Sequence, residues 1–444
     1  MKRLFIILLI VPELLLAQHI IKGQFSPAKD YNIALLYKVT PLISEYVSNA
    51  EIQNDGSFEF KLDSTVTKGI YRLVYAVPQE DYNFDILYNA KEDIDLSFNS
   101  EIGVTFNESI ENKLLTSYST SMSMVTQSIG NYFMQKSEDT MALNSIFKTQ
   151  KETQLSYEDA AKGTIALEFI KANKPYIPKR ALDVKSYVSQ LKKHYFDHVD
   201  FNNPILQSSS FLDEKMLNYV FGMSSESLDD IANYKENIDV VCSKMKGAPK
   251  EVQRILLFDL WQQMADLKIE PVANYISETY LMDIAVALND QELLRTLILY
   301  KDLSNGNIAP DFSLEVTKHD KNDAEKLSEL KLANHYIIVF WSTGCSHCLD
   351  EVPQLQTFVQ SKEEIKVIAV ALEDEPNKWN ELIKTYPEFI HVYVHGKWDN
   401  KIGDDYGVSS TPTYFVLNKK KEIIGKPEDF EAVKTFFEEK KKEE

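Results

Sequence analysis

Apolar and polar residues alternate along the first quarter of the chain. Apolar residues occupy every second position in 58–62 and again in 94–98. A period of two with one apolar face is typical of half-buried β-strands. The sequence NDG at 54–56 is a turn signal between two such runs. Residues 18–105 are therefore predicted to form a small antiparallel β-sandwich.

The apolar period changes in the middle of the chain. In 185–196 and in 251–267, apolar residues recur three or four positions apart. This spacing places them on one stripe of an α-helix. Residues 106–305 are therefore predicted to be an all-α region.

Loop-forming residues between 304 and 310 mark a further boundary. Beyond it, continuous apolar runs of strand length alternate with segments of helical period. The predicted strands are 335–341, 365–372 and 390–396, with a hairpin of 412–417 and 421–425, and the main predicted helices are 345–360, 377–386 and 427–442. Such alternation indicates a parallel α/β sheet, to which the hairpin adds a mixed edge. Residues 306–444 are predicted to be this α/β domain.

Charge narrows the range of partners. The 444 residues carry a formal net charge of −19. Nucleic acids and anionic membrane surfaces require a basic face, so neither is expected as the main partner.

The N-terminus has the pattern of a secretory leader. Lys2 and Arg3 precede an apolar run at 4–11, and Ala17 is suited to a cleavage site. We therefore predict a signal peptide over 1–17. The alternative is an uncleaved anchor, although a spanning helix needs roughly 20 apolar residues. Export would place the protein in an oxidising compartment such as the periplasm or cell envelope.

Two of the three cysteines are close together. Cys345 and Cys348 lie where a predicted buried strand meets a predicted helix. A helix N-terminus stabilises a thiolate, the nucleophile of disulfide exchange, so Cys345 is the expected attacking thiol and Cys348 the resolving one. The alternatives are a structural disulfide, a zinc site, which would need two further ligands, and two unrelated buried cysteines. No cofactor or metal is expected.

The motifs around this pair resemble a known family. "VFWSTGCSHCLDEVPQL" and "SSTPTYFVL" are similar to the thioredoxin superfamily, and 306–440 resembles its extracytoplasmic TlpA/ResA group. The resemblance implies a thiol-disulfide oxidoreductase with a cis-proline loop at Thr411 and Pro412 that faces the disulfide. It also implies that Trp341, Thr411 and Pro412 border the substrate. The segments before residue 306 resemble a small β-domain and a helical segment of uncharacterised families found in bacterial envelope proteins.

The chain departs from classical thioredoxins at two positions. Gly344 replaces the tryptophan before the first cysteine, and Val339 replaces the buried aspartate six residues before it. Glu351 matches the glutamate that the TlpA/ResA group carries three residues after the second cysteine. We therefore expect Glu351 to carry the proton of Cys348.

Ser346 and His347 bear on the direction of exchange. A histidine before the second cysteine stabilises the reduced form and favours an oxidant. The resemblance instead implies a reductase, and the sequence leaves both directions open. The expected partners are protein thiols or disulfides of the cell envelope, and a membrane redox partner is compatible with this. The oligomeric state is left open.

Two other functions compete with this interpretation. One is an envelope binding or interaction protein with a vestigial or regulatory thioredoxin module. The other is a thiol peroxidase, whose P-x-x-x-T-x-x-C spacing is absent because Ile338 stands seven residues before Cys345. Cys242 is expected to be a buried small apolar residue. His194 and His198 have metal-ligand spacing on a predicted helix but are expected to be surface or capping residues.

Overall fold

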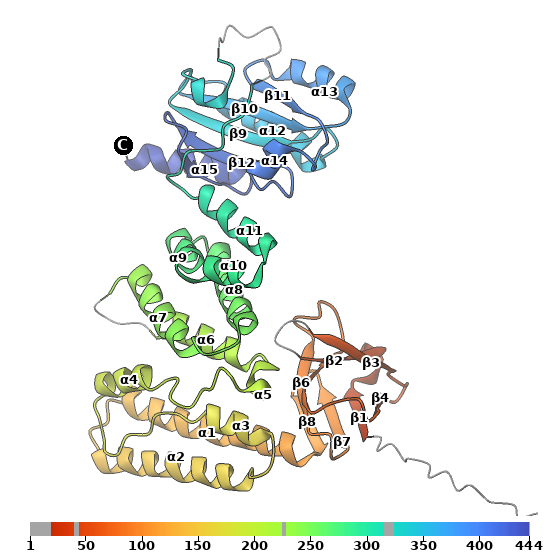
Figure 1. Cartoon of the computed structure of the whole chain (residues 1–444), viewed down its shortest axis with the longest axis vertical. Coiled ribbons are helices and arrows are strands. Elements are labelled where there is room, and N and C mark those ends of the chain that lie inside the picture. The colour runs from red at the N-terminus through yellow and green to blue at the C-terminus, as the bar shows by residue number, and fades with distance from the viewer. Residues whose placement is uncertain (1–18, 40–43, 224–227, 315–323, 444) are drawn as a thin grey trace, which may run out of the picture. The chain divides into compact units, whose positions relative to one another are not determined.

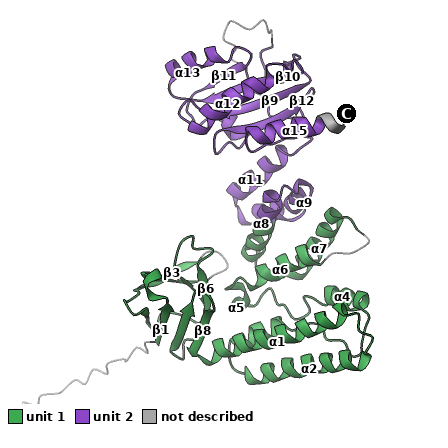
Figure 2. Ribbon diagram, turned by 180° about the vertical axis from the view of Figure 1, so that it is seen from behind, with its two compact units in different colours: residues 1–260 green, residues 261–444 purple. Residues whose placement is uncertain are grey.

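The computed structural model describes residues 19–39, 44–223, 228–314 and 324–443. The predicted signal peptide, 1–17, lies outside the described residues. The chain divides into two compact units, 1–260 and 261–444 (Figure 2). The helices of 270–302 therefore share a unit with the C-terminal sheet, whereas the predicted domain boundary at 305/306 separates them.

The first unit begins with two sheets. The strands are β1 (His19–Ser26), β2 (Ile33–Lys38), β3 (Glu45–Glu51), β4 (Ser57–Leu62), β5 (Gly69–Val74), β6 (Asn83–Tyr88), β7 (Ile94–Asn99) and β8 (Gly103–Glu108). Among the described residues they form two four-stranded sheets, in the orders β4-β1-β7-β8 and β3-β2-β5-β6. Alternate residues of both sheets, such as Phe60 and Leu73, share one core. This confirms the sandwich, with one difference: β1 and β7 run parallel.

Helices follow the sandwich (Figure 1). They are α1 (Ile110–Met134), α2 (Thr140–Ala160), α3 (Ala166–Ala172), α4 (Val184–Lys193), α5 (Pro204–Gln207), α6 (Phe211–Gly222), α7 (Asp230–Met245), α8 (Lys250–Asp266), α9 (Glu270–Ile276), α10 (Met282–Leu288) and α11 (Gln291–Asp302). The buried Asn112 side chain joins α1 to β6, since it accepts a hydrogen bond from Leu87 N at 2.9 Å and donates one to Leu87 O at 2.7 Å. The predicted all-α region is confirmed.

Two carboxyl groups meet between α6 and α8. Asp213 and Asp259 line a small cavity of about 160 Å³. Burial, together with the neighbouring charge of Asp259 and a hydrogen bond to it, raises the pKa of Asp213 to about 7. The folded protein therefore binds a proton at Asp213 that the unfolded chain releases near the ordinary value of 3.8.

The raised pKa of Asp213 predicts that the free energy of unfolding falls as the pH rises. Between about pH 4 and pH 7, Asp213 is protonated in the folded state and ionised in the unfolded chain. The contribution of this proton to the free energy of unfolding is therefore fully present below about pH 4 and is lost as the pH rises to about 7. Asp213→Asn should remove this slope and raise the free energy of unfolding at pH 8 by about 1–3 kcal/mol relative to the parent. Urea unfolding at pH 5 and pH 8 measures it. Glu251→Gln, an exposed change on α8, is the control. Identical slopes for parent and Asp213→Asn would contradict the prediction.

The second unit contains a five-stranded sheet with helices. The strands are β9 (His335–Trp341), β10 (Ile365–Leu372), β11 (Ile390–Val394), β12 (Thr413–Asn418) and β13 (Ile423–Gly425), and the further helices are α12 (Ser346–Val359), α13 (Pro376–Leu382), α14 (Lys401–Asp405) and α15 (Phe430–Glu443). The strand order is β11-β10-β9-β12-β13. The first three are mutually parallel, and β12 and β13 are antiparallel to their neighbours.

Both faces of this sheet are buried. Ile337 and Val339 of β9 face a core shared with α12 and α15, while Ile338 and Phe340 face a second core. Burial on two faces explains why the strands are continuous apolar runs. The predicted α/β domain is confirmed.

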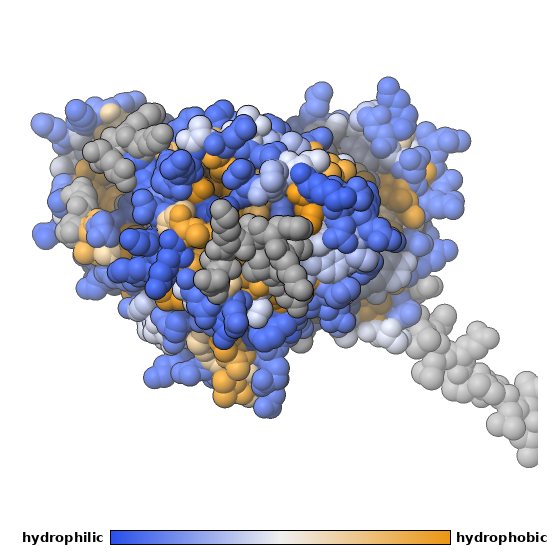
Figure 3. All heavy atoms as spheres, turned by 90° about the horizontal axis from the view of Figure 1, so that it is seen from above, coloured by the Kyte–Doolittle hydropathy of each residue, from blue (hydrophilic) through white to orange (hydrophobic). Residues whose placement is uncertain are grey.

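The outer surface in Figure 3 is mostly hydrophilic, as expected for a chain with many charged residues. On the face shown in Figure 3, hydrophilic residues predominate and apolar residues lie in small groups. Within the described ranges, no helix combines the length and the apolar character that crossing a bilayer requires.

Candidate active site

The cysteine pair lies where β9 gives way to α12. β9 ends at Trp341 and α12 begins at Ser346, so Cys345 is the N-cap residue of the helix. Cys345 and Cys348 form a disulfide, with their Cα atoms 5.3 Å apart. The N–H of Cys348 donates to Cys345 Sγ at 3.1 Å. Free N–H groups and the positive end of the helix dipole therefore surround the sulfur of Cys345.

The two sulfurs differ in accessibility. Cys345 is half-buried, whereas Cys348 is 0% exposed. Cys348 packs into the core beside Val352 and Leu355 of the same helix. A protein partner can therefore approach Cys345 and cannot approach Cys348.

The segment before β12 borders the reachable sulfur. The peptide bond between Thr411 and Pro412 is cis. Cys345 Sγ lies 3.2 Å from the carbonyl oxygen of Thr411. β12 pairs with β9, with Thr413 opposite Phe340, and this register carries the segment to the end of the strand that leads into the cysteines.

Known proteins match this part of the chain. Residues 334–423 match a family model described as Thioredoxin-like. The thiol-disulfide oxidoreductases ResA of Bacillus subtilis and Oceanobacillus iheyensis are each 26% identical to this chain, over 126 and 121 residues. The C-terminal domain is thioredoxin-like.

The thioredoxin domain is of the TlpA/ResA type and belongs to the thiol-disulfide oxidoreductases, as predicted. The matches cover 28% and 27% of this chain, and 67% and 62% of the two ResA proteins. A thioredoxin-like protein of known structure from Bacteroides caccae is 16% identical, with a TM-score of 0.33 over 59% of this chain and 96% of its own.

Glu351 of the thioredoxin domain is held by two donors. Its Oε2 accepts hydrogen bonds from the Tyr414 hydroxyl and from Phe430 N, both at 2.9 Å. Burial, followed by the charge of Glu351, raises the pKa of Tyr414. The carboxylate thus ties α12 to β12 and to the first turn of α15. Its predicted role as proton carrier for Cys348 stays a prediction.

Trp341 requires a correction. It is 0% exposed and packs in the same core as Cys348, with its ring edge-on to Tyr386 at a centroid distance of 6.2 Å. The prediction that Trp341 borders the substrate is therefore wrong. Side chains along β9 point alternately to the two faces of the sheet, and Trp341 points into the core that also contains Cys348.

The residues between the cysteines face solvent. Ser346 and His347 are both exposed at the start of α12. A substrate that reaches Cys345 would meet both of them. Their predicted effect on the redox potential stays a prediction.

Sequence reasoning missed a buried carboxylate that holds the loop before Cys345. Glu373, at the end of β10, is 2% exposed and accepts a hydrogen bond from Thr343 N. Lys378 Nζ donates to Thr343 O at 2.7 Å. Both backbone groups of Thr343 are therefore fixed from β10 and α13. An acidic residue directly after an apolar strand was the available signal.

Proposed function

We propose that the protein is an exported thiol-disulfide oxidoreductase that exchanges disulfides with protein thiols of the cell envelope through Cys345 and Cys348. The observation that carries this proposal is the unequal exposure of the two sulfurs, with Cys345 reachable at the start of α12 and Cys348 buried. The leader pattern of 1–17 supports the location.

The geometry supports a two-step exchange. In the reductive direction, the thiolate of Cys345 attacks one sulfur of a substrate disulfide, and the other sulfur leaves as a thiolate and takes up a proton. Cys348 then loses its proton and attacks Cys345, which breaks the mixed disulfide and releases the reduced substrate. Two electrons pass to the substrate, and the pair ends as the disulfide. The oxidative direction is the reverse, so a second redox partner must restore the starting form.

The segment around Thr411 supports a way to hold the substrate. Thr411, Pro412 and Thr413 are each partly exposed beside Cys345. An extended substrate chain can pair with exposed backbone as an added strand does. Its disulfide would then lie next to Cys345 Sγ.

A redox titration tests the function. The full chain is equilibrated in glutathione buffers of graded potential, alkylated and weighed by mass spectrometry. We expect one two-electron transition with a difference of two labels, since Cys242 is buried in α7 and outside the disulfide. A midpoint near roughly −270 mV indicates a reductase and one near roughly −120 mV an oxidant. Cys242→Ser should give the same curve. A third reversible label, or no transition, would refute the proposal.

A further inference from the structure

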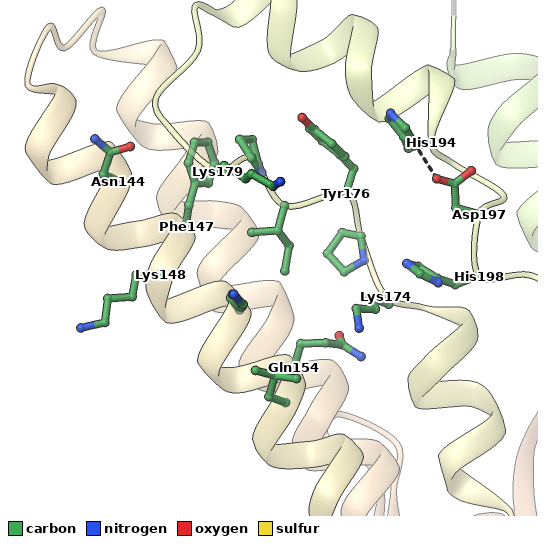
Figure 4. Close-up of a pocket in the computed structure, with 15 residues that line it drawn as sticks. Asn144, Phe147, Lys148, Gln154, Lys174, Tyr176, Lys179, His194, Asp197 and His198 are labelled. Carbon is green, nitrogen blue, oxygen red and sulfur yellow. Dashed lines mark hydrogen bonds and ion pairs between the residues drawn. The ribbon is translucent and has the colours of Figure 1, made fainter.

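A cavity of about 530 Å³ lies in the helical region of the first unit, outside the redox site. Its walls are α2, the segment 174–179 and the turn that follows α4 (Figure 4). The volume is within the range of small-molecule sites in proteins. The thioredoxin function leaves this cavity without a role.

The turn after α4 agrees with the expectation that His194 and His198 are capping or surface residues, although the helix ends before the predicted position. α4 ends at Lys193, and His194 is its C-cap residue, so His194 and His198 do not share a helical face. His194 Nδ1 is instead paired with Asp197 Oδ2 at 2.6 Å. The metal-like spacing in the sequence therefore does not produce a helical metal site.

The charges around the cavity have one dominant sign. Four lysines line it, and Asp197 is the one acidic residue among the lining residues; the lysines are Lys148, Lys151, Lys174 and Lys179. This is notable in a chain whose net charge is −19. A concave site lined by one sign of charge favours ligands of the opposite sign.

Two of the lysines already have partners. Lys174 Nζ lies 3.0 Å from Glu158 Oε1, and Lys148 Nζ lies 3.8 Å from Glu152 Oε1. The Lys148 side chain also points away from the other residues that line the cavity (Figure 4). A ligand would have to compete with a carboxylate for each of these two amines.

The other two lysines carry the positive charge of the site. Within the described ranges, neither Lys151 nor Lys179 has an ion pair or hydrogen bond. Lys151 lies on the same face of α2 as Phe147 and Gln154, which also line the cavity. Figure 4 shows the Lys179 side chain directed into the space between α2 and Tyr176. Two lysines from two different walls, α2 and the segment 174–179, therefore line the same cavity.

Aromatic and aliphatic side chains form another part of the wall. Tyr176 stacks on His194, with ring centroids 4.8 Å apart and an angle of 11° between the planes. The pairing of His194 with Asp197 holds that ring in place. The other apolar lining residues are Phe147, Leu155, Ile177 and two prolines. A flat ligand body can lie against such a surface.

We propose that this cavity binds a small organic anion, a carboxylate or phosphate carried on a single sugar-sized ring. Lys151 and Lys179 contact the anionic group, and the wall formed by Tyr176 and Phe147 packs against the ring. Charge-assisted hydrogen bonds from two amines supply the selectivity for an anion. The proposal concerns the first unit and is independent of the redox activity.

Titration calorimetry on the full chain tests it with named probes. Glucuronate carries a ring carboxylate, glucose 6-phosphate carries a phosphate, and glucose is the neutral control. We expect saturable binding of at least one of the two anions, with a dissociation constant on the order of 1 mM, and no binding of glucose. The affinity should fall with added salt, because the contacts are ionic.

Matched lysine variants locate the binding. Lys151→Gln combined with Lys179→Gln should weaken binding by about tenfold or more. Lys148→Gln, on the same helix but directed away, should retain the parent affinity. Failure of both anions to bind, equal binding of glucose, or equal losses in the double variant and in Lys148→Gln would each overturn the proposal. The redox titration is unaffected by any of these outcomes.

Discussion

Replacing Cys348 with serine should convert the protein into a trap for its own substrates. Cys345 keeps its place as the N-cap residue of α12, where free N–H groups and the helix dipole stabilise its thiolate. It can still attack, but no second thiol remains to resolve the mixed disulfide. Turnover should fall to background while covalent adducts accumulate. Non-reducing gels of cells that express the variant measure these adducts, and mass spectrometry then names the partners.

The matched variant is Cys345→Ser. Its remaining thiol, Cys348, is fully buried, so a partner cannot reach it, and neither turnover nor adducts are expected. Adducts with Cys345→Ser but not with Cys348→Ser would reverse the assigned roles. Adducts with neither variant would favour the alternative of an interaction protein with an inactive thioredoxin module. A double variant, Cys348→Ser with Cys242→Ser, should form the same adducts as Cys348→Ser and controls for adducts at Cys242.

Strands buried on both faces were predictable to the residue. β9 and β10 have the predicted bounds, because a strand buried on two faces is a continuous apolar run with polar residues at its ends. The start of α12 was also predictable, because Cys345 and Ser346 lie between an apolar strand and a segment whose apolar residues have helical spacing. The local pattern of apolar residues is therefore sufficient to predict a strand that is buried on both faces.

Long-range pairing was not predictable in the same way. Nothing in the strand pattern distinguishes a parallel from an antiparallel partner, so the pairing of β1 with β7 was missed. The end of α4 at Lys193 was missed because Tyr195 continues the apolar spacing beyond the last helical residue. Helix propensity and the spacing of apolar residues do not determine the exact residue at which a helix ends.

The site shows the same limit at the level of side chains. Trp341 was assigned to the substrate because of its motif, yet the alternation of β9 turns it inward. The hydrogen bond from Thr343 to Glu373 joins residues 30 positions apart. Which donor a carboxylate meets depends on three-dimensional packing, and Glu351 is the clearest case.

Removing the Glu351 side chain should destabilise the thioredoxin domain strongly. Glu351→Ala would leave the hydroxyl of the buried Tyr414 and the N–H of Phe430 without their acceptor. Buried donors left unsatisfied cost about 1–3 kcal/mol each, so we expect a loss of about 2–4 kcal/mol in the free energy of unfolding. Glu351→Gln keeps an amide oxygen that can accept both bonds and should cost about 1 kcal/mol. Urea unfolding of the oxidised protein measures both.

Kinetics then separate the anchoring role from the proton-transfer role. If Glu351 carries the proton of Cys348, Glu351→Gln slows release of the mixed disulfide and leaves the first attack by Cys345 unchanged, because only the second step needs Cys348 to lose its proton. Tyr414→Phe is the matched control: it removes one donor to Glu351 but keeps the carboxylate, so release should continue at the parent rate. Equal single-turnover rates in Glu351→Gln and the parent would reject the proton role and leave Glu351 as the acceptor that fixes α15. Slower release in both variants would show that the position of the carboxylate, set by Tyr414, limits the step.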